Sequence, residues 1–253
     1  SARRGMSAAA SSAAVAAAAA LAAVAVYAMS ARRLSSMRRR RTASVTLKYF
    51  DIPGLGEPIR LALSIAAVPF EDKRLTREEF VATKGGLRFG QVPCLVVDGE
   101  EVFQSASILR YIGQALDPSG TLYPADPMVA SLVDGIMDQC SDMMIGRKVY
   151  KYKQRFGFPE SVFTEEVTRT VETCWKEEVL PCHLGFFARC IAASPTGWIA
   201  GTPTATVADI LLAAILKNDV SKVGPLPNAL AAWVDAVYSL PAVKAWKEAE
   251  AAA

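Results

Sequence analysis

The fold of this chain is decided by residues 89–107, which read FGQVPCLVVDGEEVFQSAS. An Asp98-Gly99 pair separates two short apolar runs, Cys94–Val97 and Val102–Phe103. Asp-Gly between two strand-like runs is typical of a β-hairpin. A Gln-Ser pair follows the second run, and Ser105 suits the start of a helix. The residues therefore predict a strand, a turn, a second strand and a helix in close succession.

Pro93 stands at the first position of the first predicted strand, where a proline removes a hydrogen-bond donor from the sheet. This position favours a cis bond between Val92 and Pro93. The backbone of Val92 is then free to pair with an extended peptide. The N-terminus of the helix at Ser105 attracts a carboxylate. Together these features predict a receptor for a small acidic peptide.

Strands and helices also alternate before the hairpin. Residues 45–49 alternate as a strand, a helix is expected from Glu57, a strand over 70–74 and a short helix over 77–84. With the hairpin and a helix over 105–115, the order is β-α-β-α-β-β-α. A strand–helix–strand crossover needs parallel pairing, and the hairpin adds antiparallel strands. The expected domain, residues 45–116, is a small α/β unit of thioredoxin-like outline.

The rest of the chain is predicted to be all-helical. A turn-rich linker occupies 117–126, and no strand is expected in the domain at 127–250. Apolar residues recur at helical spacing over five segments, namely 127–155, 163–193, 206–217, 227–238 and 241–249. Pro181 should kink the second of them. Thr206 and Asp209 form a capping box at the start of the third, because a cap hydroxyl and a carboxylate three residues later satisfy free amides reciprocally.

Charge and cysteine content exclude several classes of function. Residues 1–48 hold eight arginines, one lysine and no acid, whereas 49–253 hold the other 19 basic and all 25 acidic residues. The net charge of −6 on this longer part argues against nucleic-acid binding. The five cysteines are scattered without CxxC spacing and His183 is the only histidine. We therefore expect no disulfide framework and no metal site, and a reducing compartment.

The first 44 residues form a separate Ala- and Arg-rich segment. Its uncharged run at 8–29 has the length of a transmembrane helix, and the six arginines that follow place the rest of the chain on the reducing side of an organelle membrane, in a plastid or mitochondrion. The same composition suits a cleaved targeting peptide. In that alternative the mature protein is cytoplasmic or soluble within the organelle.

With these motifs in this order, the chain resembles the cytosolic glutathione transferases over roughly 45–250, and most of all their sigma class, which includes prostaglandin synthases. The residues that carry the resemblance are Tyr49, Phe50, Gly54, Glu57, Arg60, 89–93, Gln104, Ser105, Thr206 and Asp209. The resemblance implies glutathione as co-substrate and Tyr49 as the catalytic residue. A hydroxyl beside the sulfur stabilises the thiolate, which is the nucleophile. Without the resemblance, Tyr49 reads as an aromatic residue of the core.

The resemblance also assigns the contacts to glutathione. Val92, beside Pro93, pairs with the cysteinyl part, and Gln104 and Ser105 hold the γ-glutamyl carboxylate. The residues assigned to the remaining groups of glutathione are Phe80, Lys84 and Gln91 near the glycyl end and Asp142, which reaches the γ-glutamyl amine bound to a partner subunit. Lys84 and Asp142 can equally be solvated helix residues. Arg60 is expected to be structural.

The chain departs from the family's pattern at two positions. Leu55 stands where the sigma and alpha classes have an arginine that helps to polarise the thiolate, and Phe80 replaces a tryptophan. Loss of the guanidinium predicts weaker thiolate formation, with glutathione binding retained.

Two functions remain open at this point. The first is a dimeric enzyme that conjugates glutathione to hydrophobic electrophiles or isomerises them. Its acceptor pocket is expected to be lined by Ile52, Leu55, Met143, Tyr150 and Trp246. The second is an accessory or structural subunit of an organelle membrane protein complex, anchored through the helix at 8–29, because a fold does not fix a function.

Overall fold

The computed structural model describes residues 44–159 and 161–252. The expected transmembrane helix at 8–29 lies outside these residues. Within the described ranges, no helix has both the length and the apolar character needed to cross a bilayer. No helix in these ranges therefore supports a transmembrane or membrane-anchored protein, and we do not carry the membrane-complex alternative further.

The four strands form one mixed sheet in the order β2-β1-β3-β4. Strand β1 (Val45–Phe50) pairs in parallel with β2 (Glu71–Leu75) and antiparallel with β3 (Cys94–Val97), and β3 pairs antiparallel with β4 (Glu100–Phe103). The Asp98-Gly99 turn joins β3 to β4, and both residues have positive φ, +50° and +88°. The predicted β-α-β-α-β-β-α order is confirmed.

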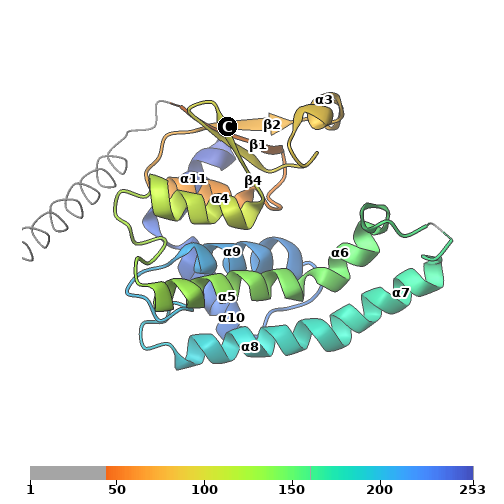
Figure 1. Ribbon diagram of the computed structural model, residues 1–253. Helices are drawn as coiled ribbons and strands as arrows, with labels where there is room; N and C mark the ends of the chain where they lie inside the picture. Colours follow the sequence, from red (N-terminus) through yellow and green to blue (C-terminus); the bar gives the residue numbers. More distant parts are fainter. Residues whose placement is uncertain (1–43, 160, 253) are drawn as a thin grey trace, which may run out of the picture. The chain divides into compact units, whose positions relative to one another are not determined.

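Helices α2 (Glu57–Ile65) and α4 (Ser105–Tyr111) lie between the sheet and the helical part of the molecule (Figure 1). Side chains of β1 alternate between buried and half-buried, as expected of a strand with one face on the core. Short helix α3 (Arg77–Thr83) has no buried residue and begins with a capping box between Thr76 and Glu79. The sheet therefore buries one face against α2 and α4.

The helical part is all-α across the described residues, as predicted. Its helices are α5 (Pro127–Met143), α6 (Ile145–Lys151), α7 (Glu165–Cys174), α8 (Leu180–Ala193), α9 (Val207–Ile215), α10 (Asn228–Tyr238) and α11 (Pro241–Ala252). Every residue of α9 is buried, and α9 packs against α2, α5 and α10. Helix α9 is therefore the centre of the core (Figure 1).

At Pro181, where the sequence predicts a kink, the structure has a π-helical turn, Trp175–Val179, between α7 and α8. Proline lacks the N–H that a regular helix needs, so the hydrogen-bond pattern shifts over the preceding turn. At the start of α9, the Thr206 hydroxyl and amide both donate to Asp209 Oδ2 at 2.8 Å, and the Ile199 amide donates to Asp209 Oδ1 at 2.8 Å. Burial raises the pKa of Asp209, and these hydrogen bonds act in the opposite direction.

Candidate active site

One hollow brings together the sheet part and the helical part. Its lining consists of Leu55, Phe89, Gln91, Val92, Pro93, Phe103, Gln104, Ser105 and Arg155. We call the first eight residues the sheet wall and Arg155 the helical wall. Five residues that the sequence assigned to glutathione therefore lie together in the sheet wall, namely Gln91, Val92, Pro93, Gln104 and Ser105.

Backbone geometry shapes the sheet wall. The Val92–Pro93 peptide bond is cis, as predicted. Gln104, between β4 and α4, has a φ of +68°, which is uncommon for a residue with a side chain. Such conformations persist where the surrounding structure imposes them, often at binding sites. Gln104 and Ser105 therefore face the hollow from a sharply turned connection.

Tyr49 lies directly behind this lining, at the end of β1. Its side chain is 7% exposed, and its hydroxyl oxygen accepts a hydrogen bond from the Leu55 amide at 3.0 Å. Burial raises the pKa of Tyr49 and outweighs the hydrogen bond from Leu55, which lowers it. The hydroxyl therefore keeps its proton at neutral pH. That proton is available for donation because the contact with Leu55 uses the oxygen as an acceptor.

Two glycines make room for the Tyr49 ring. A Cβ atom on Gly54 would lie 2.6 Å from the Tyr49 hydroxyl oxygen, and Gly54 also has a φ of +38°. A Cβ atom on Gly56 would lie 2.4 Å from the ring carbon Cδ1. The loop between β1 and α2 therefore closes around the ring only with glycine at both positions.

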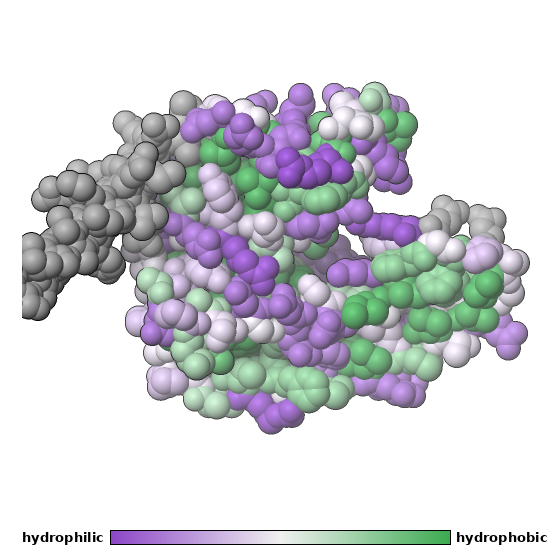
Figure 2. Space-filling view, viewed as in Figure 1, coloured by the Kyte–Doolittle hydropathy of each residue, from purple (hydrophilic) through white to green (hydrophobic). Residues whose placement is uncertain are grey.

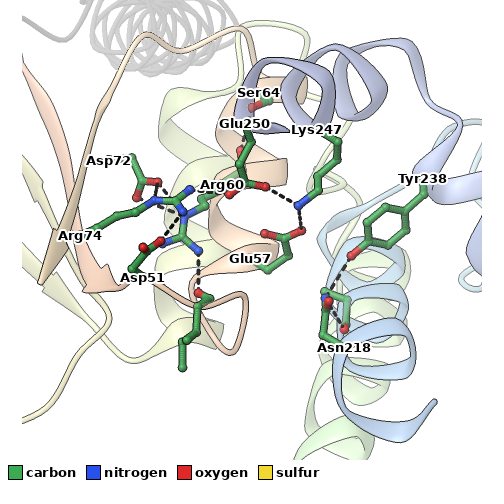
Figure 3. A network of polar contacts seen from close by, with 12 residues as sticks. Asp51, Glu57, Arg60, Ser64, Asp72, Arg74, Asn218, Tyr238, Lys247 and Glu250 are labelled. Carbon is green, nitrogen blue, oxygen red and sulfur yellow. Dashed lines mark hydrogen bonds and ion pairs between the residues drawn. The ribbon is translucent and has the colours of Figure 1, made fainter. Parts of the chain in front are cut away.

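Arg60 holds the loop between β1 and α2 in place through hydrogen bonds. Its guanidinium is fully buried and donates to Asp72 at 2.9 Å, to the Ile52 carbonyl at 3.0 Å and to the Phe50 carbonyl at 3.2 Å (Figure 3). The guanidinium carbon also lies 5.9 Å from the centre of the Tyr49 ring. With its donors used by the protein, Arg60 is placed to hold the loop rather than to meet a ligand.

Helix α11 extends this polar network (Figure 3). Lys247 donates to the buried carboxylate of Glu57 at 3.0 Å, and it also pairs with Glu250. Glu250 in turn pairs with Arg74, which contacts Asp51 at 2.5 Å. The C-terminal helix is thereby tied to β2 and to the first turn of α2, on which the Tyr49 loop rests.

Three residues that the sequence assigned to glutathione do not line the hollow. Phe80 packs edge-on against Phe50, with ring centres 5.2 Å apart. Lys84 follows α3, and its stem lies close to Gly90. Asp142 is exposed near the end of α5. Their roles stay predictions.

Of the five residues expected in the acceptor pocket, Leu55 alone lines this hollow. Met143 is fully buried, and Tyr150 is buried with its ring 6.2 Å from that of Trp175. Trp246 stacks on Phe70 with ring centres 5.1 Å apart and packs against the core. Helical periodicity marks these three residues as apolar. Met143 and Tyr150 are buried in the core and Trp246 is half-buried against it, so none of the three lines the hollow, and their place in an acceptor pocket stays a prediction. The other two expected residues, Ile52 and Leu55, are exposed, and Leu55 lines the hollow.

Sequence reasoning assigned no role to Phe103 or Arg155, and it included Phe89 only as part of the 89–93 motif. Phe89 and Phe103 lie in the quoted stretch and pack edge-on with ring centres 5.7 Å apart. Because Phe89 comes just before Gln91 and Phe103 just before Gln104 in the sequence, both could have been predicted to line the site. Arg155 lies in the short turn Lys153–Phe156 between α6 and α7, and nothing in its local sequence marks it.

Comparison with known proteins identifies the family. The family described as "Glutathione S-transferase, N-terminal domain" matches residues 45–114, and "Glutathione S-transferase, C-terminal domain" matches 155–250. Glutathione S-transferase 1 of Ascaris suum is 34% identical over 203 residues, which cover 79% of this chain and 93% of that protein. A glutathione S-transferase of Anopheles gambiae is 33% identical over 71% of this chain and 82% of its own length.

Solved structures agree with these matches. Prostaglandin synthase D of Nilaparvata lugens superposes with a TM-score of 0.67 and 30% identity, over 81% of this chain and 97% of that one. The glutathione S-transferase of Ascaris lumbricoides has a TM-score of 0.64 and 32% identity, over 81% and 96%. Sequence, fold and both domain matches lead to one conclusion: the chain belongs to the glutathione S-transferase family, whose members use glutathione as co-substrate.

Proposed function

We propose that this protein conjugates glutathione to hydrophobic electrophiles, with Tyr49 as the donor that activates the thiol. The observation that carries the proposal is the hydrogen bond from the Leu55 amide to the Tyr49 hydroxyl oxygen, 3.0 Å long. It orients the hydroxyl at the back of the hollow and leaves its proton free. A hydroxyl that donates to sulfur stabilises the thiolate and lowers the pKa of the thiol.

Glutathione would lie along the sheet wall. The backbone of Val92 would pair with the cysteinyl part, and Gln104 and Ser105 would hold the γ-glutamyl carboxylate. Lys84 and Gln91 would meet the glycyl end. This arrangement directs the sulfur toward Leu55 and the Tyr49 hydroxyl behind it.

The reaction is a nucleophilic attack by the thiolate. The thiol proton leaves to solvent, and the sulfur lone pair forms a carbon–sulfur bond with the electrophile. The electron pair displaced from the attacked carbon departs with the leaving group, or moves into the conjugated system of the acceptor. Tyr49 keeps its proton throughout, because its contribution is a hydrogen bond to the anion.

The apolar acceptor would approach from the end of the molecule where α6 and α7 meet. Hydrophobic residues gather on this end (Figure 2), where Tyr152, Phe156 and Phe158 are exposed. Similarity to prostaglandin synthase D of Nilaparvata lugens supports placing the chain near the sigma class. Leu55 leaves the sheet wall without the arginine that helps to polarise the thiolate in that class.

We also propose a homodimer, in which the exposed Asp142 reaches the site of the partner subunit. One structural relative, from Necator americanus, is described as monomeric. The dimer is therefore to be tested on its own, by the sedimentation of the purified protein.

A titration of bound glutathione tests the Tyr49 mechanism. The full chain is saturated with glutathione, and thiolate absorbance in the ultraviolet is followed against pH, with the Tyr49→Phe variant in parallel. The variant should return the thiol pKa toward that of free glutathione and lower kcat/KM about 100-fold, because one donor to the developing anion is lost. Bound glutathione without any lowering of its pKa in the wild-type protein would refute the mechanism.

A further inference from the structure

Among the described residues that line the hollow, Arg155 alone carries a charge. The sheet wall offers apolar side chains, one serine and two glutamines. Glutathione carries two carboxylates and one ammonium group at neutral pH, and thiolate formation adds a further negative charge. The described lining of the hollow therefore has one cation to meet a ligand that becomes doubly negative.

The Arg155 guanidinium is free to meet that ligand. No carboxylate among the described residues pairs with it, whereas Arg60, Arg74, Arg110 and Arg147 all form ion pairs. Its backbone is held, because the Arg155 amide donates to the Tyr152 carbonyl at 2.8 Å. Arg155 is thus an exposed side chain on a hydrogen-bonded turn, and no ion pair balances its charge within the part of the chain that the structure describes.

The surroundings of Arg155 place it at the sulfur end of the hollow. Leu55 lines the same hollow, and its amide contacts the Tyr49 hydroxyl. Tyr152, three residues before Arg155, lies close enough to affect the pKa of Tyr49. The turn that carries Arg155 therefore begins next to a residue within electrostatic reach of the Tyr49 hydroxyl, and Arg155 lines the same hollow as Leu55, whose amide contacts that hydroxyl.

Lys148 supports the same conclusion. Burial lowers the pKa of Lys148, and the charge of Arg155 lowers it further, while Asp142 acts in the opposite direction. Lys148 thus lies within electrostatic reach of Arg155, the charged residue of the helical wall. A bound anion would relieve this repulsion, since opposite charges at short range favour each other's charged forms.

We propose that Arg155 is a catalytic residue whose guanidinium lies against the glutathione sulfur and stabilises its thiolate. This inference rests on the proposed Tyr49 mechanism and adds to it a second stabilising group, contributed by the helical wall. The Tyr49 hydroxyl donates a hydrogen bond to the sulfur from the sheet side, and the Arg155 guanidinium supplies positive charge from the helical wall. The turn between α6 and α7 thereby supplies the positive charge that is missing at position 55.

Four variants of the full chain test this inference. Arg155→Met removes the charge and keeps most of the length, and Arg155→Lys keeps the charge. Leu55→Arg combined with Arg155→Met returns a guanidinium to the same hollow from the other wall. Arg88→Met is the matched control, because Arg88 is an exposed arginine 6.0 Å from the Phe103 ring that does not itself line the hollow.

For each variant the pKa of bound glutathione, its dissociation constant and the pH profile of kcat/KM are measured. Arg155→Met should raise the thiol pKa by about one unit and lower kcat/KM about tenfold at about pH 6.5, with convergence at high pH. Arg155→Lys and the double variant should recover most of the loss, and Arg88→Met should match the wild-type protein. Added salt should shrink the difference, because the charge is exposed.

Three results would overturn the inference, each in a distinguishable way. If the wild-type protein lowers the thiol pKa and Arg155→Met leaves that pKa unchanged, Arg155 has no role in activation and the Tyr49 mechanism stands. If Arg155→Met weakens glutathione binding without moving the thiol pKa, the guanidinium holds a carboxylate instead. If the wild-type protein does not lower the thiol pKa at all, the Tyr49 mechanism and the role of Arg155 fail together.

Discussion

The two walls of the hollow are built in different ways. The sheet wall depends on backbone geometry, including the cis bond before Pro93 and the positive φ of Gln104. The helical wall is one exposed side chain, Arg155, on a short turn. The sheet wall, which would bind glutathione, is therefore shaped by the fold. The helical wall, which would face the sulfur, depends on a single exposed side chain that a substitution can replace.

Two arginines show the same contrast. Arg60 is fully buried, and its donors are used by Asp72 and two carbonyls. Arg155 is exposed and forms no ion pair among the described residues. A buried, satisfied guanidinium supports structure, and an exposed, unpaired one beside a hollow is available for chemistry.

The largest expected effect tests this contrast through stability. Arg60→Met should lower the free energy of unfolding by about 3 kcal/mol, because Asp72 and the carbonyls of Phe50 and Ile52 lose a buried donor. Arg155→Met should change it by less than about 0.5 kcal/mol. Urea denaturation of both variants measures the difference. Equal losses would show that the two arginines do not divide into structural and functional roles.

The next effect concerns binding on the sheet wall. Gln104→Ala should weaken glutathione binding about 30-fold, the equivalent of about 2 kcal/mol for a hydrogen bond to a carboxylate. The thiol pKa of glutathione that still binds should not move, because Gln104 is assigned to the other end of the molecule. Calorimetry and the thiolate titration check the two parts. A shifted pKa with unchanged affinity would contradict the assignment.

A smaller effect should follow from crowding the Tyr49 hydroxyl. Gly54→Ala puts a Cβ atom where only 2.6 Å is available and strains a φ of +38°. The hydroxyl must move, and kcat/KM should fall about tenfold. Gly224→Ala is the control, because nothing lies within 4 Å of its added Cβ atom. Unchanged activity in Gly54→Ala would show that the hydroxyl position is not critical.

The smallest effect concerns acid stability. Burial by itself would raise the pKa of Glu250, but hydrogen bonds from Lys247 and Arg74 outweigh it, so the pKa in the folded protein lies below the ordinary 4.5. This stabilisation is present above pH 4.5 and is lost as the pH falls through the folded-state pKa. Glu250→Gln should therefore cost less than about 1 kcal/mol at neutral pH. Unfolding curves should converge in acid, and a difference that grows there would contradict the assignment.

Most of the sheet wall could be predicted from sequence because, apart from Leu55, its residues all lie within the stretch 89–105. Gln91, Val92 and Pro93 precede one strand, and Gln104 and Ser105 follow the next, so a local hairpin is enough to unite them. The acceptor side could not be predicted in this way. Apolar periodicity indicated that Met143 and Trp246 belong to amphipathic helices, but it did not show that their neighbours would bury them.

The sequence by itself therefore determined the order of strands and helices, the hairpin with its cis-proline edge, and Tyr49 at the end of β1. Local patterns carry this information, because turns, caps and strands depend on residues a few positions apart. Only the tertiary structure decided that Arg155, more than 100 positions after Tyr49, lines the same hollow as Leu55. Packing of α6 and α7 against the rest of the protein brings this distant turn to the site, and no local pattern encodes that approach.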